Sequence, residues 1–261
     1  VLVERGKKRE FSERVATGYL TFELDDWIFT EPTARERLMK QFQTGSLKGF
    51  GVDHMRSAVI ASGAILHYLD ITNHTRTSHI AALSRIDEDH YVRLDNFTIR
   101  NLELTESMGA DGKSLLDVLD RTVTPMGARM LRRWLLFPLK DVAAINSRLD
   151  VITEFMRQPD MRDELSESLS SIGDMERLTG KVAVGRVSPR ELNQLSQALS
   201  LVEPLKAACS ASSDATLQAI GEQLTPCAGI RDRIAREIVH APPVALKRGE
   251  VVRECVDEEL D

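Results

Sequence analysis

The chain has 261 residues, of which 42% are hydrophobic and 28% charged, a composition typical of a globular protein with one or two cores. Its net charge of -6 excludes a protein whose whole surface attracts nucleic acid, so any contact with DNA would have to be local. Aromatic residues make up only 5%, which favours cores built from aliphatic side chains on helices and argues against an all-β fold.

Residues 1–84 are predicted to form an α/β domain. VLVE at the start and YLTFEL (Tyr19–Leu24) have the alternation of strands. A helix is expected to begin with Pro32 at its first position and to end at Gly45. Asp53 is placed to cap a second helix, whose small residues allow close approach to a sheet. These small residues are Ala58, Ala61, Gly63 and Ala64.

Residues 85–261 are predicted to be mostly helical. The strand-like HYVRL (His90–Leu94) marks the entry, and helical periods then dominate. Ser188–Glu191 is a capping box with a proline that opens one helix, and Thr225-Pro226 is expected to open another. Residues 244–254 alternate like a short hairpin with Gly249 in its turn, so a small β element is predicted near the C-terminus. Other expected helices span residues 112–121, 125–137, 142–156 and 160–172.

Motifs that could hold a nucleotide or a metal are incomplete. ADGKS (Ala110–Ser114) ends like a phosphate-binding loop, but Ser107 stands where that loop needs a glycine, so a helix start capped by Asp111 is favoured. Glu23 and Asp25 would share one face of a strand, as in a metal-dependent nuclease, although no further carboxylates are identified and a solvated strand edge is favoured. His67, His74 and His79 lack the spacing of a metal pair on a helix.

The sequence also limits the candidate DNA contacts, the cellular compartment and the membrane segments of this chain. The basic run RGKKRE (Arg5–Glu10) is short and is predicted to be a solvated linker rather than a DNA contact. Cys209, Cys227 and Cys255 form no paired motif, which favours a reducing, cytoplasmic compartment. The longest apolar stretch, residues 58–66, is shorter than the about 18 to 20 residues of a membrane helix.

Several motifs, in order along the whole chain, resemble the family of bacterial MutS proteins. LDRTVTPMG (Leu119–Gly127), followed by Arg129 and Trp134, is similar to the signature of its core domain. GSLKGFGVD (Gly45–Asp53) resembles the end of its connector domain. Further similar segments are LDNFTIRNLEL, IGDMERLTGKVA, SPRELNQL, APPVALKRGEVV and the final DEELD. Because the chain starts at Val1 without an initiator Met, we expect it to be an excised part of a longer protein.

The resemblance implies a fold and a function for both parts. Residues 1–84 would be an incomplete connector domain with an RNase H-like fold, and residues 85–261 the first half of a helical core or lever domain. The full-length family recognises mismatched double-stranded DNA, works as a homodimer, signals to the MutL protein and hydrolyses ATP with Mg²⁺ in another domain. The fragment itself is expected to be non-catalytic and without a cofactor. Alternatives are an RNase H-like nuclease and a MutS paralogue that acts in recombination.

The resemblance places no catalytic, DNA-contacting, metal or nucleotide residue on this chain, but a structural junction is predicted. Thr124 would cap and Pro125 would start a new helix, so that the chain changes direction at a fixed point after Asp120. Arg129, Arg132 and Arg133 flank the Met126, Met130 and Trp134 stripe, and they are expected to pair with acids of adjoining helices rather than with DNA. Trp134 is expected to lock the junction, at about 3 to 5 kcal/mol if it is buried.

Overall fold

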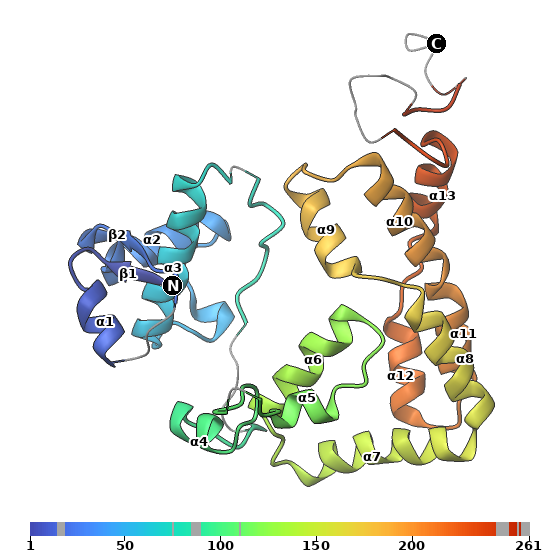
Figure 1. Ribbon diagram of the computed structural model, residues 1–261. Helices are drawn as coiled ribbons and strands as arrows, with labels where there is room; N and C mark the ends of the chain where they lie inside the picture. Colours follow the sequence, from blue (N-terminus) through green and yellow to red (C-terminus); the bar gives the residue numbers. More distant parts are fainter. Residues whose placement is uncertain are drawn as a thin grey trace. The chain divides into compact units, whose positions relative to one another are not determined.

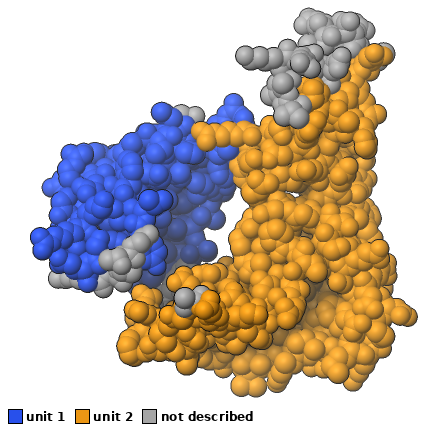
Figure 2. Space-filling model, in the orientation of Figure 1, with its two compact units in different colours: residues 1–86, 183–185 blue, residues 87–182, 186–261 orange. Residues whose placement is uncertain are grey.

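The computed structural model describes residues 1–14, 19–74, 76–84, 90–109, 111–243, 251–254 and 256. The chain divides into two compact units, residues 1–86 with 183–185 (unit 1) and residues 87–182 with 186–261 (unit 2) (Figure 2). Helices dominate the described residues, and their two strands lie near the N-terminus. The prediction of an α/β part followed by a mainly helical part is confirmed in this coarse order.

Unit 1 begins with two short parallel strands joined by a helix. Strand β1 (Leu2–Glu4) pairs with β2 (Phe22–Leu24), and Val3 lies opposite Glu23. Both strands fall in the segments where the alternation predicts them. Between them, α1 (Lys8–Arg14) contradicts the prediction of a linker over the basic run. Its helical spacing lets Arg9 pair with Glu13 at 2.8 Å, one turn further along.

A pair of α-helices with two single-turn 3-10 helices completes unit 1. The predicted stop at Gly45 is wrong, because the helix ends earlier and Gln43 takes the left-handed conformation with φ of 50°. Thr30 occupies the N-cap position and Pro32 the second helical position rather than the first. The elements are η1 (Asp26–Phe29), α2 (Glu31–Gln41), η2 (Lys48–Phe50) and α3 (Arg56–Ile71).

Asp53 does not cap the second of these helices. The N-cap of α3 is Met55, whose side chain makes no cap hydrogen bond. Asp53 instead accepts a hydrogen bond from the Nη1 atom of Arg35 at 2.5 Å, while Nη2 of the same guanidinium donates to the Asp53 carbonyl at 2.8 Å. A charge-assisted bond to arginine is stronger than a neutral bond to a backbone amide, so the carboxylate serves to hold the loop to α2.

The core of unit 1 lies where α2 crosses α3. Gly63 faces Ala34, and a Cβ atom built on Gly63 would lie only 2.5 Å from the Cα atom of Ala34. The small residues of α3 therefore allow close approach to another helix, not only to the sheet as predicted. Figure 1 shows α2 and α3 side by side. The buried core here consists of Ala34, Leu38, Leu47, Val52, Val59 and Leu66, and a second cluster beside the sheet contains Leu24, Ile28 and Ala64.

Unit 2 starts with an extended segment and a short helix. The strand-like pattern at residues 90–94 yields only an isolated antiparallel bridge between Tyr91 and Leu139. Asp95 then caps α4 (Asn96–Asn101), because its Oδ1 atom accepts the Thr98 amide at 2.7 Å.

The four following helices fall where helical periods predict them. The cap of the first differs, because Ser114 rather than Asp111 accepts the amide of Asp117, in a reciprocal capping box. Asp141 caps α7 through the amide of Ala144. The helices are α5 (Leu115–Leu119), α6 (Pro125–Leu136), α7 (Val142–Arg157) and α8 (Pro159–Ser170).

Five further helices follow in the described part of unit 2. The capping box of Ser188 and Glu191 is confirmed. The predicted start at Thr225-Pro226 is wrong, because the last helix begins at Ala228 after Cys227 takes the left-handed conformation. The helices are α9 (Met175–Ala183), α10 (Pro189–Ser200), α11 (Val202–Ala211), α12 (Ala215–Gln223) and α13 (Ala228–Glu237). The buried core that α8 shares with α10, α11 and α12 contains Leu165, Ile172, Ala198, Leu205, Cys209 and Leu217.

The predicted hairpin near the C-terminus lies largely outside the described residues, since these exclude 244–250. Val252, within the predicted hairpin, forms an antiparallel bridge with Ile238, which precedes it. The Val239 amide also donates to the Val251 carbonyl at 3.0 Å. The bridge involves single residues, so no C-terminal strand is present in the part of the chain that the structure describes.

Candidate functional site at the helix junction

The turn between α5 and α6 is fixed by its own side chains. Asp120 is the C-cap of α5, and its Oδ1 atom accepts the Thr122 hydroxyl at 2.6 Å and the Thr122 amide at 2.9 Å. These two bonds, the hydroxyl first, lower the pKa of Asp120 below its ordinary value. An ionised Asp120 therefore holds the chain in a turn at the point where α5 ends.

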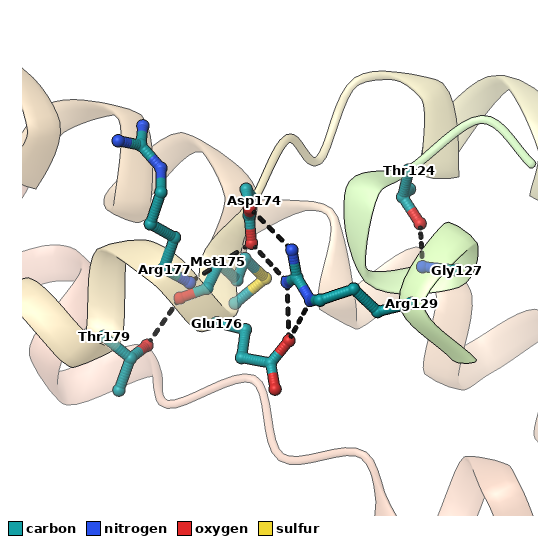
Figure 3. Close-up of polar contacts among 8 residues, drawn as sticks. All are labelled: Thr124, Gly127, Arg129, Asp174, Met175, Glu176, Arg177 and Thr179. Atoms are coloured by element: carbon teal, nitrogen blue, oxygen red, sulfur yellow. Dashed lines mark hydrogen bonds and ion pairs between the residues drawn. The ribbon is translucent and has the colours of Figure 1, made fainter. Parts of the chain in front are cut away.

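Helix α6 begins at a cap with little free space. The Oγ1 atom of Thr124 accepts the Gly127 amide at 2.9 Å, and Pro125 supplies a preset φ at the first helical position (Figure 3). A Cβ atom on Gly127 would lie 3.0 Å from Thr124 Oγ1 and 3.4 Å from the Cβ atom of Thr122. The direction of α6 is thus set by a cap and by close packing against the preceding turn.

Replacing Thr124 with alanine is expected to lower the free energy of unfolding by about 1 kcal/mol, because the Gly127 amide loses its acceptor. Thr124→Ser keeps the hydroxyl and should stay close to wild type. Chemical denaturation of both variants measures the difference. Equal loss in the serine and alanine variants would contradict a capping role.

Arg129 joins α6 to the start of α9. Its Nη1 and Nη2 atoms donate to the two carboxylate oxygens of Asp174 at 3.1 and 2.8 Å, and its Nε and Nη2 atoms reach Glu176 at 2.8 and 2.5 Å (Figure 3). This confirms the expectation for Arg129, but it is wrong for Arg132 and Arg133, whose side chains pair with no acid among the described residues. Exposed ion pairs contribute little individually, but a bidentate arginine held by two carboxylates has a defined geometry that a single contact lacks.

Asp174 has two functions in this contact. Besides binding Arg129, its Oδ1 atom accepts the backbone amide of Arg177 at 3.1 Å in the first turn of α9. The bonds from Arg129 are the main reason why the pKa of Asp174 lies below its ordinary value, and the Arg177 amide adds to the effect. The same carboxylate therefore binds Arg129 of α6 and caps the first turn of α9. This shared contact couples the orientation of α9 to that of α6.

Trp134 is at the surface, so the condition that its side chain is buried at the junction is not met. Its side chain is 42% exposed. The ring is covered on one face by Arg148 of α7, whose Cζ atom lies 3.7 Å from the ring centroid. Such a cation–π contact is worth about 0.5 to 1 kcal/mol at an exposed site, well below the cost of emptying a core. Trp134 thus links α6 to α7 by a surface contact.

The corner between α6 and α7 holds the segment that enters unit 2. The Val92 amide donates to the Pro138 carbonyl at 2.7 Å, and the Lys140 amide donates to the His90 carbonyl at 3.2 Å. In the same corner, the rings of Tyr91 and Phe137 meet edge to face, with centroids 5.9 Å apart. Backbone and aromatic contacts therefore fix the entering segment at this corner.

A buried carboxylate that the sequence did not single out joins α7 to the loop between α11 and α12. Glu154 is buried and accepts the hydroxyls of Ser213 at 2.8 Å and of Ser212 at 3.4 Å, together with the side-chain amide of Gln158. The bond from Ser213 is the largest reason why its pKa is lowered. No local signal marks this contact, because Glu154 follows a threonine in an ordinary amphipathic helix and its serine partners lie far along the chain.

A second carboxylate links α9 to α10. The Nζ atom of Lys181 donates to Glu191 at 2.5 Å, while the other oxygen of Glu191 accepts the Ser188 amide at 3.0 Å. These bonds, that from Lys181 first, lower the pKa of Glu191 to about 2. The capping box is visible in the sequence, but its lysine partner is not.

We expect this carboxylate to make unit 2 less stable in acid. Because the pKa of Glu191 is about 2 in the folded chain, whereas an unperturbed glutamate has a pKa of 4.5, its stabilisation is complete above pH 4.5 and is lost as pH falls towards 2. Glu191→Gln should therefore flatten the stability profile between these pH values. Denaturation midpoints across that range measure the effect, and an unchanged slope in the variant would refute it.

The phosphate-loop-like turn does not fit a nucleotide. The hydroxyl of Ser114 donates to Asp117 at 2.7 Å and is fully buried. Ser107 fills the space over Gly112, where an added Cβ would come within 1.9 Å of its Oγ atom. A phosphate would meet a carboxylate and no open cradle, so we derive no ATP chemistry from these residues.

The early carboxylates and two of the three histidines, His67 and His74, have structural partners. Glu23 accepts the Gly6 amide at 3.4 Å, and Asp25 pairs with Arg5 at 2.8 Å. The ring of His67 meets Trp27 edge to face, and Nδ1 of His74 lies 2.9 Å from the Thr72 hydroxyl. Within the described residues no three His, Cys, Asp or Glu side chains gather to hold a metal, so nothing favours the nuclease alternative.

No helix in the described part of the chain combines the length and the apolar character needed to cross a bilayer.

Comparison with known proteins relates both parts of the chain to one family. The family model for MutS domain II matches residues 4–81, and the model for MutS domain III matches residues 97–260. Proteins named DNA mismatch repair protein MutS are similar over all 261 residues: that of Bacteroides thetaiotaomicron is 56% identical, that of Porphyromonas gingivalis 46% and that of Flavobacterium johnsoniae 42%. The chain spans only 29 to 30% of the length of these relatives.

Proposed function

Because the chain belongs to the MutS family, we propose that it is the connector and core part of a DNA mismatch-repair protein, and that it transmits a signal without catalysing a reaction. Residues 1–84 would form part of an RNase H-like connector domain, and residues 85–261 the first half of the core or lever domain. The proposal rests on the family match and on the contact of Arg129 with Asp174, which ties the orientation of one helix to the start of another.

The longer protein would supply the partners and the chemistry. Mismatched double-stranded DNA would bind mainly through parts outside these residues, and ATP with Mg²⁺ would bind in a further domain. MutL would dock partly on the connector surface, and the full-length protein would act as a homodimer in the cytoplasm. The names of the relatives, which share the whole of this chain, support a role in mismatch repair.

Two helices can transmit a displacement only if their contact has a discrete packed arrangement. Arg129 meets this condition, since it reaches both Asp174 and Glu176 from one guanidinium. The turn at Asp120 and the cap at Thr124 define the direction of α6 on its other side. These residues, with Pro125 and Trp134, form the proposed coupling junction.

In the full-length protein, Arg129→Ala should weaken the stimulation of ATP hydrolysis by mismatched DNA about fivefold or more, because the coupling between α6 and α9 is lost. Mismatch binding and the basal rate of hydrolysis should stay close to wild type. Arg129→Lys should recover only part of the stimulation, since an ammonium cannot form the two-pronged contact. Steady-state hydrolysis with matched and mismatched duplexes measures the ratio.

Arg132→Ala is the matched control for this experiment. Arg132 lies on the same helix and is exposed, and its side chain makes no hydrogen bond or ion pair with the described residues. Its loss should leave the stimulation unchanged. Full stimulation in Arg129→Ala, with the contact shown to be broken by faster amide exchange in α9, would overturn the proposed coupling.

A further inference from the structure

Helices α10 and α13 lie side by side (Figure 1), and a polar groove opens between α10 and the segment that follows α13. Two adjoining cavities of about 260 and 100 Å³ form this α10 groove, and both are lined by Asn193, Gln197 and His240. No aspartate or glutamate occurs among the described lining residues. The nitrogen-bearing side chains of the groove are Arg190, Asn193, Gln194, Gln197, His240 and Arg253.

One side of α10 faces this groove. Arg190, Asn193, Gln194 and Gln197 lie at steps of three, one and three residues, which is the spacing of neighbours on one helix face. Gln194 and Gln197 are exposed, and their side chains make no hydrogen bond with the described residues. Their amides therefore supply N–H donors that the described part of the fold does not use.

Backbone carbonyls hold both arginines of the groove in place. The Nε atom of Arg190 donates to the Pro242 carbonyl at 2.7 Å, and the Nε atom of Arg253 donates to the Ile238 carbonyl at 2.9 Å. The Nη atoms of both guanidiniums have no partner among the described residues. A carbonyl orients a guanidinium without neutralising it, so two fixed positive charges remain available at the groove.

The acids that lie close in sequence do not neutralise these charges in the described part of the chain. Glu237 pairs with two arginines of its own helix at 3.0 and 3.1 Å. Glu191 is bound by Lys181 of α9, and Glu254, which follows Arg253, lines neither cavity. The whole chain has a net charge of -6, yet this groove presents positive charge.

We propose that the α10 groove binds a phosphate group. Arg190 and Arg253 would each donate through their Nη atoms, and the side-chain amide of Gln197 and the imidazole of His240 would donate between them. Donors from both walls of a groove suit a tetrahedral phosphate, whose oxygens point in several directions, better than a planar carboxylate with two oxygens. The inference goes beyond the proposed function, which assigns no ligand to unit 2.

A free phosphate ion and the phosphodiester backbone of DNA both supply this chemistry. The test is therefore made in the full-length protein with inorganic phosphate in one arm and a mismatched duplex in the other. Phenylglyoxal modifies guanidinium groups, and mass spectrometry reads the rate at each arginine. At constant ionic strength, we expect the phosphate group to slow the modification of Arg190 and Arg253 about threefold or more. Arg157, which is exposed on α7, should react at an unchanged rate.

Gln197→Glu removes the site without disturbing the arginine anchors. The substitution keeps the shape of an exposed side chain and places a negative charge in both cavities, so it should weaken the protection by phosphate about fivefold or more. Gln223→Glu is the matched control, because it adds the same charge to the exposed surface of α12 outside the groove. This control should retain full protection.

The two arms identify the source of the phosphate. Protection by inorganic phosphate that is lost in Gln197→Glu supports a site for the free ion, and protection by the duplex alone, with the same loss, supports a contact with the DNA backbone. Absence of protection in both arms would overturn the proposal. Equal slowing by chloride would also overturn it, since the effect would then be charge screening, as would equal protection in Gln197→Glu and Gln223→Glu.

Discussion

Gly63→Ala is expected to destabilise unit 1 by about 2 kcal/mol or more, although alanine is the better helix former. The added methyl group would lie 2.5 Å from both the Cα and the Cβ atom of Ala34, so α2 and α3 would have to separate. The gain in helix propensity is worth about 1 kcal/mol at most and cannot offset the loss of packing along the whole contact. Hydrogen exchange of the α2 and α3 amides measures the change within this unit.

Gly49→Ala is the control for this prediction. A Cβ atom on Gly49 meets nothing within 4 Å, so the substitution adds a methyl group at no steric cost. Protection of α2 and α3 should be unchanged in this variant. If Gly63→Ala were as well protected as Gly49→Ala, the close approach of the two helices would be refuted.

Leu217→Ala is expected to lower the stability of unit 2 by about 3 to 5 kcal/mol. The side chain is only 3% exposed and lies in the core that α11 and α12 share, with Leu205 and Cys209. Its removal loses apolar burial and leaves a cavity that neighbouring helices fill only in part. Guanidinium denaturation followed by helical circular dichroism measures the loss.

Ile220→Ala tests the same helix at its surface. Ile220 is 43% exposed, and its truncation should cost less than about 1 kcal/mol. The two variants remove aliphatic side chains from α12 at positions three residues apart. Similar losses in both would contradict the core position of Leu217.

Local patterns predicted the helices of this chain well, because the signals are themselves local. The capping box at Ser188 and the proline start of α6 depend on residues within one turn, and both are found where the sequence places them. The predictions that Asp53 and Asp111 cap helices were wrong for a related reason. An aspartate has the chemistry of a cap, but Arg35 binds Asp53, and Ser114 caps α5 in place of Asp111.

Contacts between distant segments were only partly predictable. The sequence indicated that Arg129 would bind acids of an adjoining helix, yet it could not select Asp174 and Glu176, which lie 45 and 47 residues away. The contacts of Glu154 with Ser212 and Ser213 left no trace in any pattern. The exposure of Trp134 was not predictable either. The apolar period of α6 suggested that its side chain is buried, but a period does not say which residues would cover it.

The pairing of residues 90–92 with residues 138–140 determines where unit 2 receives any movement of the chain that leads into it. A force on the chain before residue 90 would act on the bend between α6 and α7 before it acted on α4, which follows in sequence. Trp134 lies on one helix of this bend and Arg148 on the other, so the entering segment is anchored where a cation–π contact joins the two helices.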